Sequence, residues 1–136
     1  MPDSAPLTKK IETTVPAAGA AVAQDQVVGE APFAGEVTGV SITPEAALTA
    51  NGTNYRTFTL VNKGQAGAGT TVIATFATDT PTTDDLVAFD EKNLTLSAVA
   101  DATDVAAGDI LAVVETVAAS GVAHSGYKCQ VEISRG

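Results

Sequence analysis

Strict alternation of apolar and polar residues near the C-terminus constrains the fold more than any other feature of the chain. From Tyr127 to Ser134, every odd-numbered residue is apolar and every even-numbered residue is polar. Successive side chains of a β-strand point to opposite faces of the sheet. The segment 127–134 is therefore predicted to be a strand with one buried face and one face in water.

The rest of the chain after residue 35 also has the pattern of strands. Alternation recurs in the segments 36–43, 56–62, 71–77, 86–89 and 93–98, and 109–117 is nearly all apolar, as in a strand covered on both faces. Turn signals such as Asn51-Gly52 and Ser120-Gly121 separate these segments. We predict an all-β fold, a single antiparallel β-sandwich or jelly-roll-like domain of about seven or eight strands. A helical turn at 44–50 is a local alternative, and 98–107 is predicted to be a loop.

The first thirty residues have a different composition. They are rich in Pro, Ala, Gly and Thr, with only scattered larger apolar residues. Because such a segment cannot bury enough apolar surface to fold alone, we predict a flexible, extended N-terminal arm over 1–30 and a β-sandwich domain over 31–136. A secretory signal with Lys9 and Lys10 as its basic region is the alternative, but Pro16 and Gly19 interrupt its apolar core.

The charge of the chain argues against several classes of partner. Seven Lys and Arg residues stand against sixteen Asp and Glu residues, which gives a formal net charge of −9. Nucleic acids and anionic membranes both attract basic surfaces, so we expect neither as a partner. The single Cys excludes an intrachain disulfide and a cysteine zinc cluster, and no apolar run approaches the roughly 20 residues of a membrane span.

His124 is the single histidine, and Ser125 follows it. A Ser–His nucleophile pair needs an orienting carboxylate and an oxyanion hole, and no motif identifies either. We therefore interpret His124 as a solvated loop histidine. Acidic residues cluster in the segment 79–91, where a calcium site is the alternative to a solvated acidic loop, but the loop pattern of calcium-binding proteins is missing. We predict no metal site and no cofactor.

Two further features have structural interpretations. In the glycine-rich segment 64–70, Lys63 precedes the glycines and a predicted strand follows them, whereas a phosphate-binding loop needs Gly-Lys-Ser/Thr at the start of a helix. This segment is predicted to be a hairpin loop. Cys129 lies on the inward face of the last predicted strand and is interpreted as a small buried hydrophobe. Because no catalytic group of residues emerges, we expect that the protein is not an enzyme.

A series of short phrases in residues 31–136 resembles a known family. They include APFAGEV at 31–37, RTFTLVNKG at 56–64, NLTLS at 93–97 and DVAAGDIL at 104–111, with shorter phrases at 44–48, 51–54, 67–72 and 90–92. Their order resembles the small capsid decoration or head-fibre proteins of tailed bacteriophages. The resemblance implies a non-enzymatic virion protein that is made in the bacterial cytoplasm. Such a protein binds the major capsid protein on the outer capsid surface, commonly as a trimer, and braces the shell.

The composition also favours association with copies of the chain. A core of Ala and Val releases less free energy per residue than a core with many aromatic side chains, so burial of strand faces against other copies would add stability. We predict a homo-oligomer, with a trimer as the form that the resemblance implies. Apolar residues of the N-terminal segment are predicted to dock on the capsid, and the alternative for each is packing on its own subunit or no contact. They are Leu7, Ile11, Val15, Val22, Val27, Val28 and Phe33.

Two other functions are considered beside capsid decoration. A receptor-binding or glycan-binding display module on the virion surface needs exposed aromatic side chains to stack on sugar rings. A small hydrolase would be centred on His124.

Overall fold

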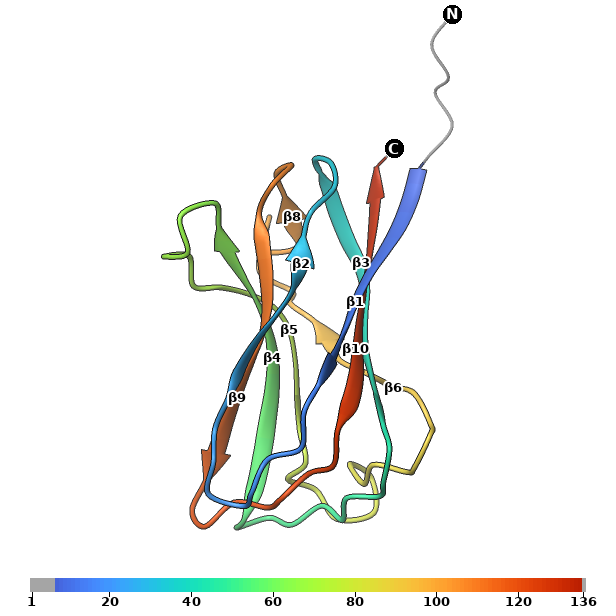
Figure 1. Ribbon diagram of the computed structural model, residues 1–136, viewed down its shortest axis with the longest axis vertical. Helices are drawn as coiled ribbons and strands as arrows, with labels where there is room; N and C mark the ends of the chain where they lie inside the picture. The colour runs from blue at the N-terminus through green and yellow to red at the C-terminus, as the bar shows by residue number, and fades with distance from the viewer. Residues whose placement is uncertain (1–6, 136) are drawn as a thin grey trace, which may run out of the picture.

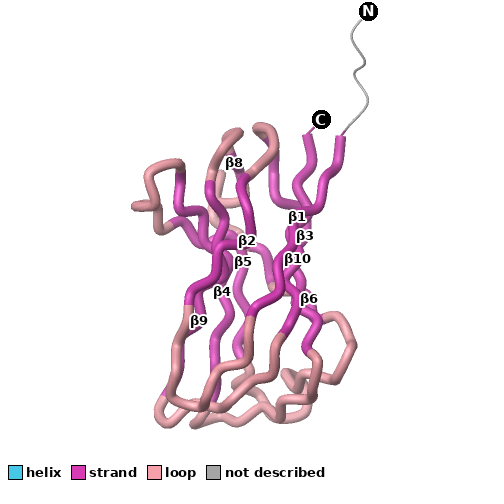
Figure 2. The backbone as a smooth tube through the Cα atoms, in the orientation of Figure 1, coloured by secondary structure: helices cyan, strands magenta, loops and turns pink. Residues whose placement is uncertain are grey.

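The computed structural model describes residues 7–135, in which ten strands form two antiparallel sheets of five strands packed face to face (Figure 1). No helix forms in this range, and the loops gather at the two ends of the strands (Figure 2). The predicted antiparallel β-sandwich is confirmed, with ten strands in place of about seven or eight. The first sheet contains β1 (Leu7–Val15), β10 (Tyr127–Arg135), β3 (Gly35–Pro44), β6 (Lys92–Asn93) and β8 (Asp104–Val105). The second contains β2 (Asp25–Glu30), β9 (Ile110–Ala118), β4 (Tyr55–Gly64), β5 (Thr71–Ala77) and β7 (Thr95–Leu96).

The pairing of the strands is that of one long hairpin that has been rolled up. β4 pairs with β5, β3 with β6, β2 with β9 and β1 with β10, so the partners are nested along the chain. Rolling this hairpin adds the pairs β10–β3 and β9–β4, which complete the two sheets. This is the connectivity of a jelly roll, with β7 and β8 as short additions at β5 and β3.

The core lies between the sheets and follows the alternation of the sequence. The odd-numbered residues of β10 from Tyr127 to Ile133 are at most 2% exposed, as predicted for this strand. Phe58 of β4 is fully buried and packs edge-on against Tyr127, with the ring centroids 5.3 Å apart. Burial of a side chain of this size contributes about 1.5–3 kcal/mol, so contacts of this kind between the sheets hold the sandwich together.

The part of the predicted arm that the structure describes belongs to the sandwich. β1 pairs with β10 in an unbroken register from Leu7 to Val15, and β2 pairs with β9. An edge strand needs apolar side chains on one face only, and Val15 (fully buried) and Val28 (7% exposed) supply them. Residues 1–6 of the predicted arm lie outside the described residues, whereas within residues 7–30 the structure has two sheet strands in place of a flexible arm. The composition of residues 7–30 does not indicate these two strands, because the strands are stabilised by partners about a hundred residues away in sequence.

Three shorter predictions also differ from the structure. The segment 86–89 is not a strand, because Leu86 makes only an isolated bridge with Leu48 and Phe89 has left-handed backbone at φ +61°. The segment 93–98 contributes to two strands, because the chain crosses from β6 in the first sheet to β7 in the second with Leu94 buried at the crossing. No helical turn forms at 44–50, and the predicted loop 98–107 contains β8.

Candidate functional site

A buried cluster of polar side chains surrounds the carboxylate of Glu115. Its Oε1 accepts hydrogen bonds from Arg56 Nη1 at 2.9 Å and from His124 Nε2 at 2.8 Å. Its Oε2 accepts hydrogen bonds from the Tyr127 hydroxyl at 2.6 Å and from Gln24 Nε2 at 3.3 Å. The side chains of Arg56 and Glu115 are completely excluded from solvent. We call these five residues the Glu115 cluster.

The strand phase of the sequence places the cluster inside the sandwich. Arg56 has the same phase as Phe58 on β4, and Glu115 has the same phase as Val113 on β9, so both charged side chains point inward. Tyr127 reaches the same carboxylate from β10 of the opposite sheet. The Glu115 cluster therefore joins the two sheets as well as neighbouring strands.

Arg56 uses its remaining N–H groups to hold two loops. It donates to the carbonyl oxygens of Val22 at 2.6 Å and Gly19 at 2.8 Å, in the connector between β1 and β2. It also donates to the carbonyl oxygen of Val122, in the loop between β9 and β10, at 3.1 and 3.2 Å. Both loops lie at the lower end of the sandwich in Figure 1. A guanidinium group is well suited to this role, because it presents five donors in a fixed plane.

His124 belongs to this buried cluster, so its interpretation as a solvated loop histidine is wrong. It is 7% exposed, and its ring contacts the rings of Phe58 and Tyr127 edge-on. Its Nδ1 lies 2.6 Å from the carbonyl oxygen of Ser125, and its Nε2 lies 2.8 Å from Glu115 Oε1. The Ser125 hydroxyl donates to the carbonyl oxygen of Gly126 and not to the His124 ring, so Ser125 and His124 do not form a Ser–His pair.

The cluster also sets the ionisation of Glu115. Burial alone would raise the pKa of this carboxyl, but hydrogen bonds from His124 and Tyr127, the charge of His124 and the hydrogen bond from Gln24 together hold it below its ordinary value. Burial and the neighbouring Glu115 carboxylate raise the pKa of the Tyr127 hydroxyl far above its usual range. The carboxylate is therefore charged and the phenol neutral at physiological pH. Within residues 7–135, every buried side-chain nitrogen and oxygen has a hydrogen-bond partner.

The predicted capsid-binding residues do not form one surface. Val15 and Val28 are part of the core, and Ile11 and Phe33 pack against it. For these four, the alternative of packing on their own subunit describes the structure. Leu7 on β1, Val22 in the connector and Val27 on β2 are exposed, by 36%, 53% and 55%.

The acidic segment 79–91 bonds to its own surroundings. Asp85 Oδ1 accepts a hydrogen bond from the amide of Ala50 at 2.8 Å, and Asp84 Oδ2 accepts one from the amide of Thr80 at 3.1 Å. Among the described residues, no three His, Cys, Asp or Glu side chains are grouped so that they could hold a metal ion. The carboxylates of Asp84 and Asp85 therefore bond to backbone amides of nearby loops.

Two structural interpretations of the sequence are confirmed. The segment 64–70 is the loop of the β4–β5 hairpin, with left-handed backbone at Gly64 (φ +68°) and Gly67 (φ +82°). Cys129 is completely buried on the inward face of β10, and this burial raises the pKa of its thiol to about 12. The residue is a core thiol without thiolate character at neutral pH.

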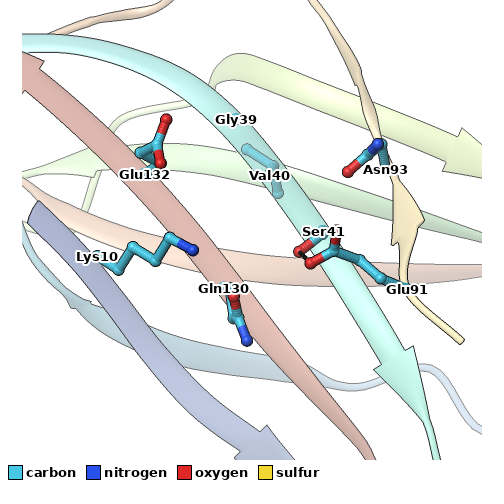
Figure 3. Close-up of a pocket in the computed structure, with 8 residues that line it drawn as sticks. All are labelled: Lys10, Gly39, Val40, Ser41, Glu91, Asn93, Gln130 and Glu132. Atoms are coloured by element: carbon cyan, nitrogen blue, oxygen red, sulfur yellow. Dashed lines mark hydrogen bonds between the residues drawn. The ribbon is translucent and has the colours of Figure 1, made fainter. Parts of the chain in front are cut away.

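A shallow polar hollow of about 190 Å³ lies on the outer face of the first sheet (Figure 3). Lys10 reaches it from β1, Gln130 and Glu132 from β10, and Ser41 from β3. Its other lining residues are Gly39, Val40, Glu91 and Asn93. The Ser41 hydroxyl donates to Glu91 at 3.0 Å, and the side chain of Lys10 extends from β1 toward β10 (Figure 3). We call this feature the outer hollow.

The sequence contains a signal for the Glu115 cluster that no motif describes. Glu115 is the single acid among residues 110–118, in phase with Leu111 and Val113. Arg56 is likewise in phase with Phe58. A charged residue on the inward face of a predicted strand requires a partner of opposite charge, and two such residues on two strands predict an ion pair.

Comparisons with known proteins give little more. No family model and no curated protein matches the chain. Among solved structures, it is similar to a chain of infectious bursal disease virus, Gx strain, at 12% sequence identity and a TM-score of 0.41. The match covers 95% of this chain and 32% of the other, so this chain spans about a third of that protein's length. A likeness this distant carries no information about function. Residues 7–135 also contain no helix with the length and hydropathy of a membrane span.

Proposed function

We propose that the protein is a structural component of a virus particle that binds the outer surface of a tailed-phage capsid as an oligomer and reinforces the shell without catalysis. The jelly-roll strand order carries this proposal, because viral capsid proteins commonly use this architecture. The order of phrases that resembles phage decoration proteins supports the same conclusion. Since fold does not imply function, both supports are analogies and binding to capsids is the decisive measurement.

The interior of the protein fits a role that depends on stable shape. The Glu115 cluster ties the connector 16–24 and the loop 119–126 to both sheets, and its polar atoms bond to one another. A surface presented by these loops keeps one geometry, which lowers the entropic cost of binding a partner. Several subunits bound to one shell would also gain from multivalency.

The test is co-sedimentation of the purified protein with heads assembled from the major capsid protein of the same virus. We expect saturable binding with a fixed number of copies per head. A triple variant that changes the exposed apolar residues Leu7, Val22 and Val27 to Ser should bind more weakly. A control that changes Val72 and Val99 to Ser alters exposed valines elsewhere and should bind normally. Absence of binding to the heads would refute the proposal.

A glycan-binding display module is a second candidate, because the outer hollow offers carboxylate, amide and hydroxyl groups that can bond sugar hydroxyls. Phe89 also supplies an exposed aromatic ring, with 78% of its surface in solvent. A glycan array tests this function. A hit that is lost in Asn93→Ala would support it, and an array without hits would rule it out for the glycans tested.

A further inference from the structure

β1 is the one long and regular free edge among the described residues. It pairs with β10 over nine residues without a bulge, and with no other strand in the part of the chain that the structure describes. The edge strand β2 is interrupted by a bulge between Val27 and Gly29. On the far side of the sheets, the strands β6, β7 and β8 are two residues long, and they cover parts of β3 and β5. Bulges and short length are two ways in which proteins protect sheet edges, and β1 has neither of them.

We propose that β1 pairs antiparallel with β1 of a second copy of this chain across a two-fold axis, with Ile11 opposite Ile11. The pairing joins the two first sheets into one continuous sheet that runs from β6 of one copy to β6 of the other. A two-fold contact of this kind is isologous, so one strand has to be complementary to itself.

The side chains of β1 alternate between the two faces of the sheet. Lys10 and Glu12 lie on the outer face, where Lys10 lines the outer hollow and Glu12 Oε2 lies 3.1 Å from Lys128 Nζ. Ile11 points inward and packs against the core. A two-fold axis perpendicular to the sheet puts the outer faces of both copies on the same side, so outward residues face outward residues. On β1 the even-numbered residues face outward and the odd-numbered residues face inward. Two opposite residues are therefore both even or both odd, and the sum of their numbers is even.

The charges of β1 select one register. Three registers obey this rule and overlap at least seven of the nine residues, and their centres are residues 10, 11 and 12. The first puts Lys10 opposite Lys10, and the third puts Glu12 opposite Glu12. Only the register centred on Ile11 puts Lys10 of each copy opposite Glu12 of the other, which forms two attractive pairs.

The neighbouring pairs fit the same register. Thr8 faces Thr14 of the second copy, so two β-branched residues with hydroxyl groups lie opposite each other on the outer face. The two Ile11 side chains meet on the inner face and extend the core across the axis. Lys10 would discourage pairing with a basic strand and Glu12 would discourage pairing with an acidic strand, so these two residues favour a copy of this strand over edges of uniform charge.

Charge reversal tests the register. Lys10→Glu places a second carboxylate opposite Glu12, and Glu12→Lys places a second ammonium group opposite Lys10, so each variant turns two attractions into two repulsions. We expect each variant to self-associate at least about tenfold more weakly than the wild type. Sedimentation at equilibrium over a range of concentrations should then show the wild type reaching the doubled mass at a concentration at least about tenfold lower than either variant needs. A trimer formed through other surfaces would show the same factor of two.

Mixing the two variants is the critical experiment. A Lys10→Glu copy and a Glu12→Lys copy are complementary to each other, so the mixture should recover the wild-type mass, as should the double variant alone. Lys63→Glu carries the same change of charge on β4 and should associate like the wild type. Circular dichroism checks that each variant is folded, and recovery of the wild-type mass on mixing demonstrates directly that both variants are folded.

A wild type with the same mass as Lys10→Glu, or single variants that do not recover on mixing, would overturn the proposal. Because the experiment uses purified protein without capsids, it fails or succeeds independently of capsid binding.

Discussion

The Glu115 cluster and the outer hollow are built from the same kinds of side chain but lie on opposite faces of the first sheet. Each combines a cation, a carboxylate and an amide, which are Arg56, Glu115 and Gln24 inside and Lys10, Glu132 and Gln130 outside. Inside, every donor and acceptor has a partner within the protein. Outside, the groups compete with water. Burial and saturation of hydrogen bonds, and not residue type, therefore separate a structural tie from a surface that is available to a ligand.

Removal of the buried cation should have the largest effect. Arg56→Ala leaves the Glu115 carboxylate without its guanidinium partner and frees the carbonyl oxygens of Val22 and Gly19. Breaking a buried ion pair costs about 3–5 kcal/mol of unfolding free energy. Urea unfolding followed by circular dichroism measures the loss. A loss below about 1 kcal/mol would mean that the cluster does not stabilise the fold.

Removal of one neutral donor from the same carboxylate should have an intermediate effect. Tyr127→Phe keeps the ring contact with Phe58 but deletes the hydroxyl that donates to Glu115 at 2.6 Å. A hydrogen bond to a charged group contributes about 1.5–3 kcal/mol, so the urea midpoint should fall by a corresponding amount. Tyr55→Phe, outside the cluster, is the control and should leave the midpoint unchanged.

The buried carboxylate should also make stability depend on acidity. Because the pKa of Glu115 is lower in the folded state than the ordinary value of 4.5, the unfolded chain binds the proton more readily. This part of the stability is fully present above the ordinary value and is lost as the pH falls through the folded-state pKa, with a slope of at most about 1.4 kcal/mol per pH unit.

Unfolding free energies measured from pH 6 to pH 2.5 test this dependence. Glu115→Gln should flatten the acid limb relative to the wild type, besides lowering stability at neutral pH. Glu132→Gln on the outer face serves as the comparison. Parallel acid limbs for the wild type and Glu115→Gln would show that Glu115 does not ionise as described.

The smallest effect is expected at the outer hollow. Glu132→Gln retains an acceptor for the Thr38 hydroxyl, which now donates to Glu132 at 3.0 Å. Surface substitutions of this kind usually stay within about 0.5 kcal/mol, so the urea midpoint should match that of the wild type. A loss as large as that of Arg56→Ala would remove the distinction between the two groups of polar residues.

The alternation of residues predicted most of the sandwich because strand periodicity is a local signal. β10, β5 and β9 lie within one residue of the predicted segments at each end. β1 and β2 were missed because their stability depends on β10 and β9, which are distant in sequence, and not on their own composition. Phe89 breaks the predicted strand 86–89 through a backbone conformation that alternation cannot indicate.

The Glu115 cluster was only partly predictable. The phases of Arg56 and Glu115 indicate that both face inward, but strand order decides that they meet, and order is not written in either segment. His124 was misinterpreted because a Gly-flanked loop usually lies in solvent, whereas this loop is held down by Arg56 through the carbonyl oxygen of Val122. The outer hollow needs four segments of the chain to come together, and no short motif describes it.

The nested pairing of the strands has a consequence for synthesis of the protein. β1 is made first of the ten strands, yet its partner β10 is the last of them in chain order. During translation, the β1 segment has no partner strand until nearly all of the domain has been made. Pairings between segments so distant in sequence also form slowly. The first sheet is therefore completed only after the last strand has been made, and segment 7–15 stays without its partner for most of translation.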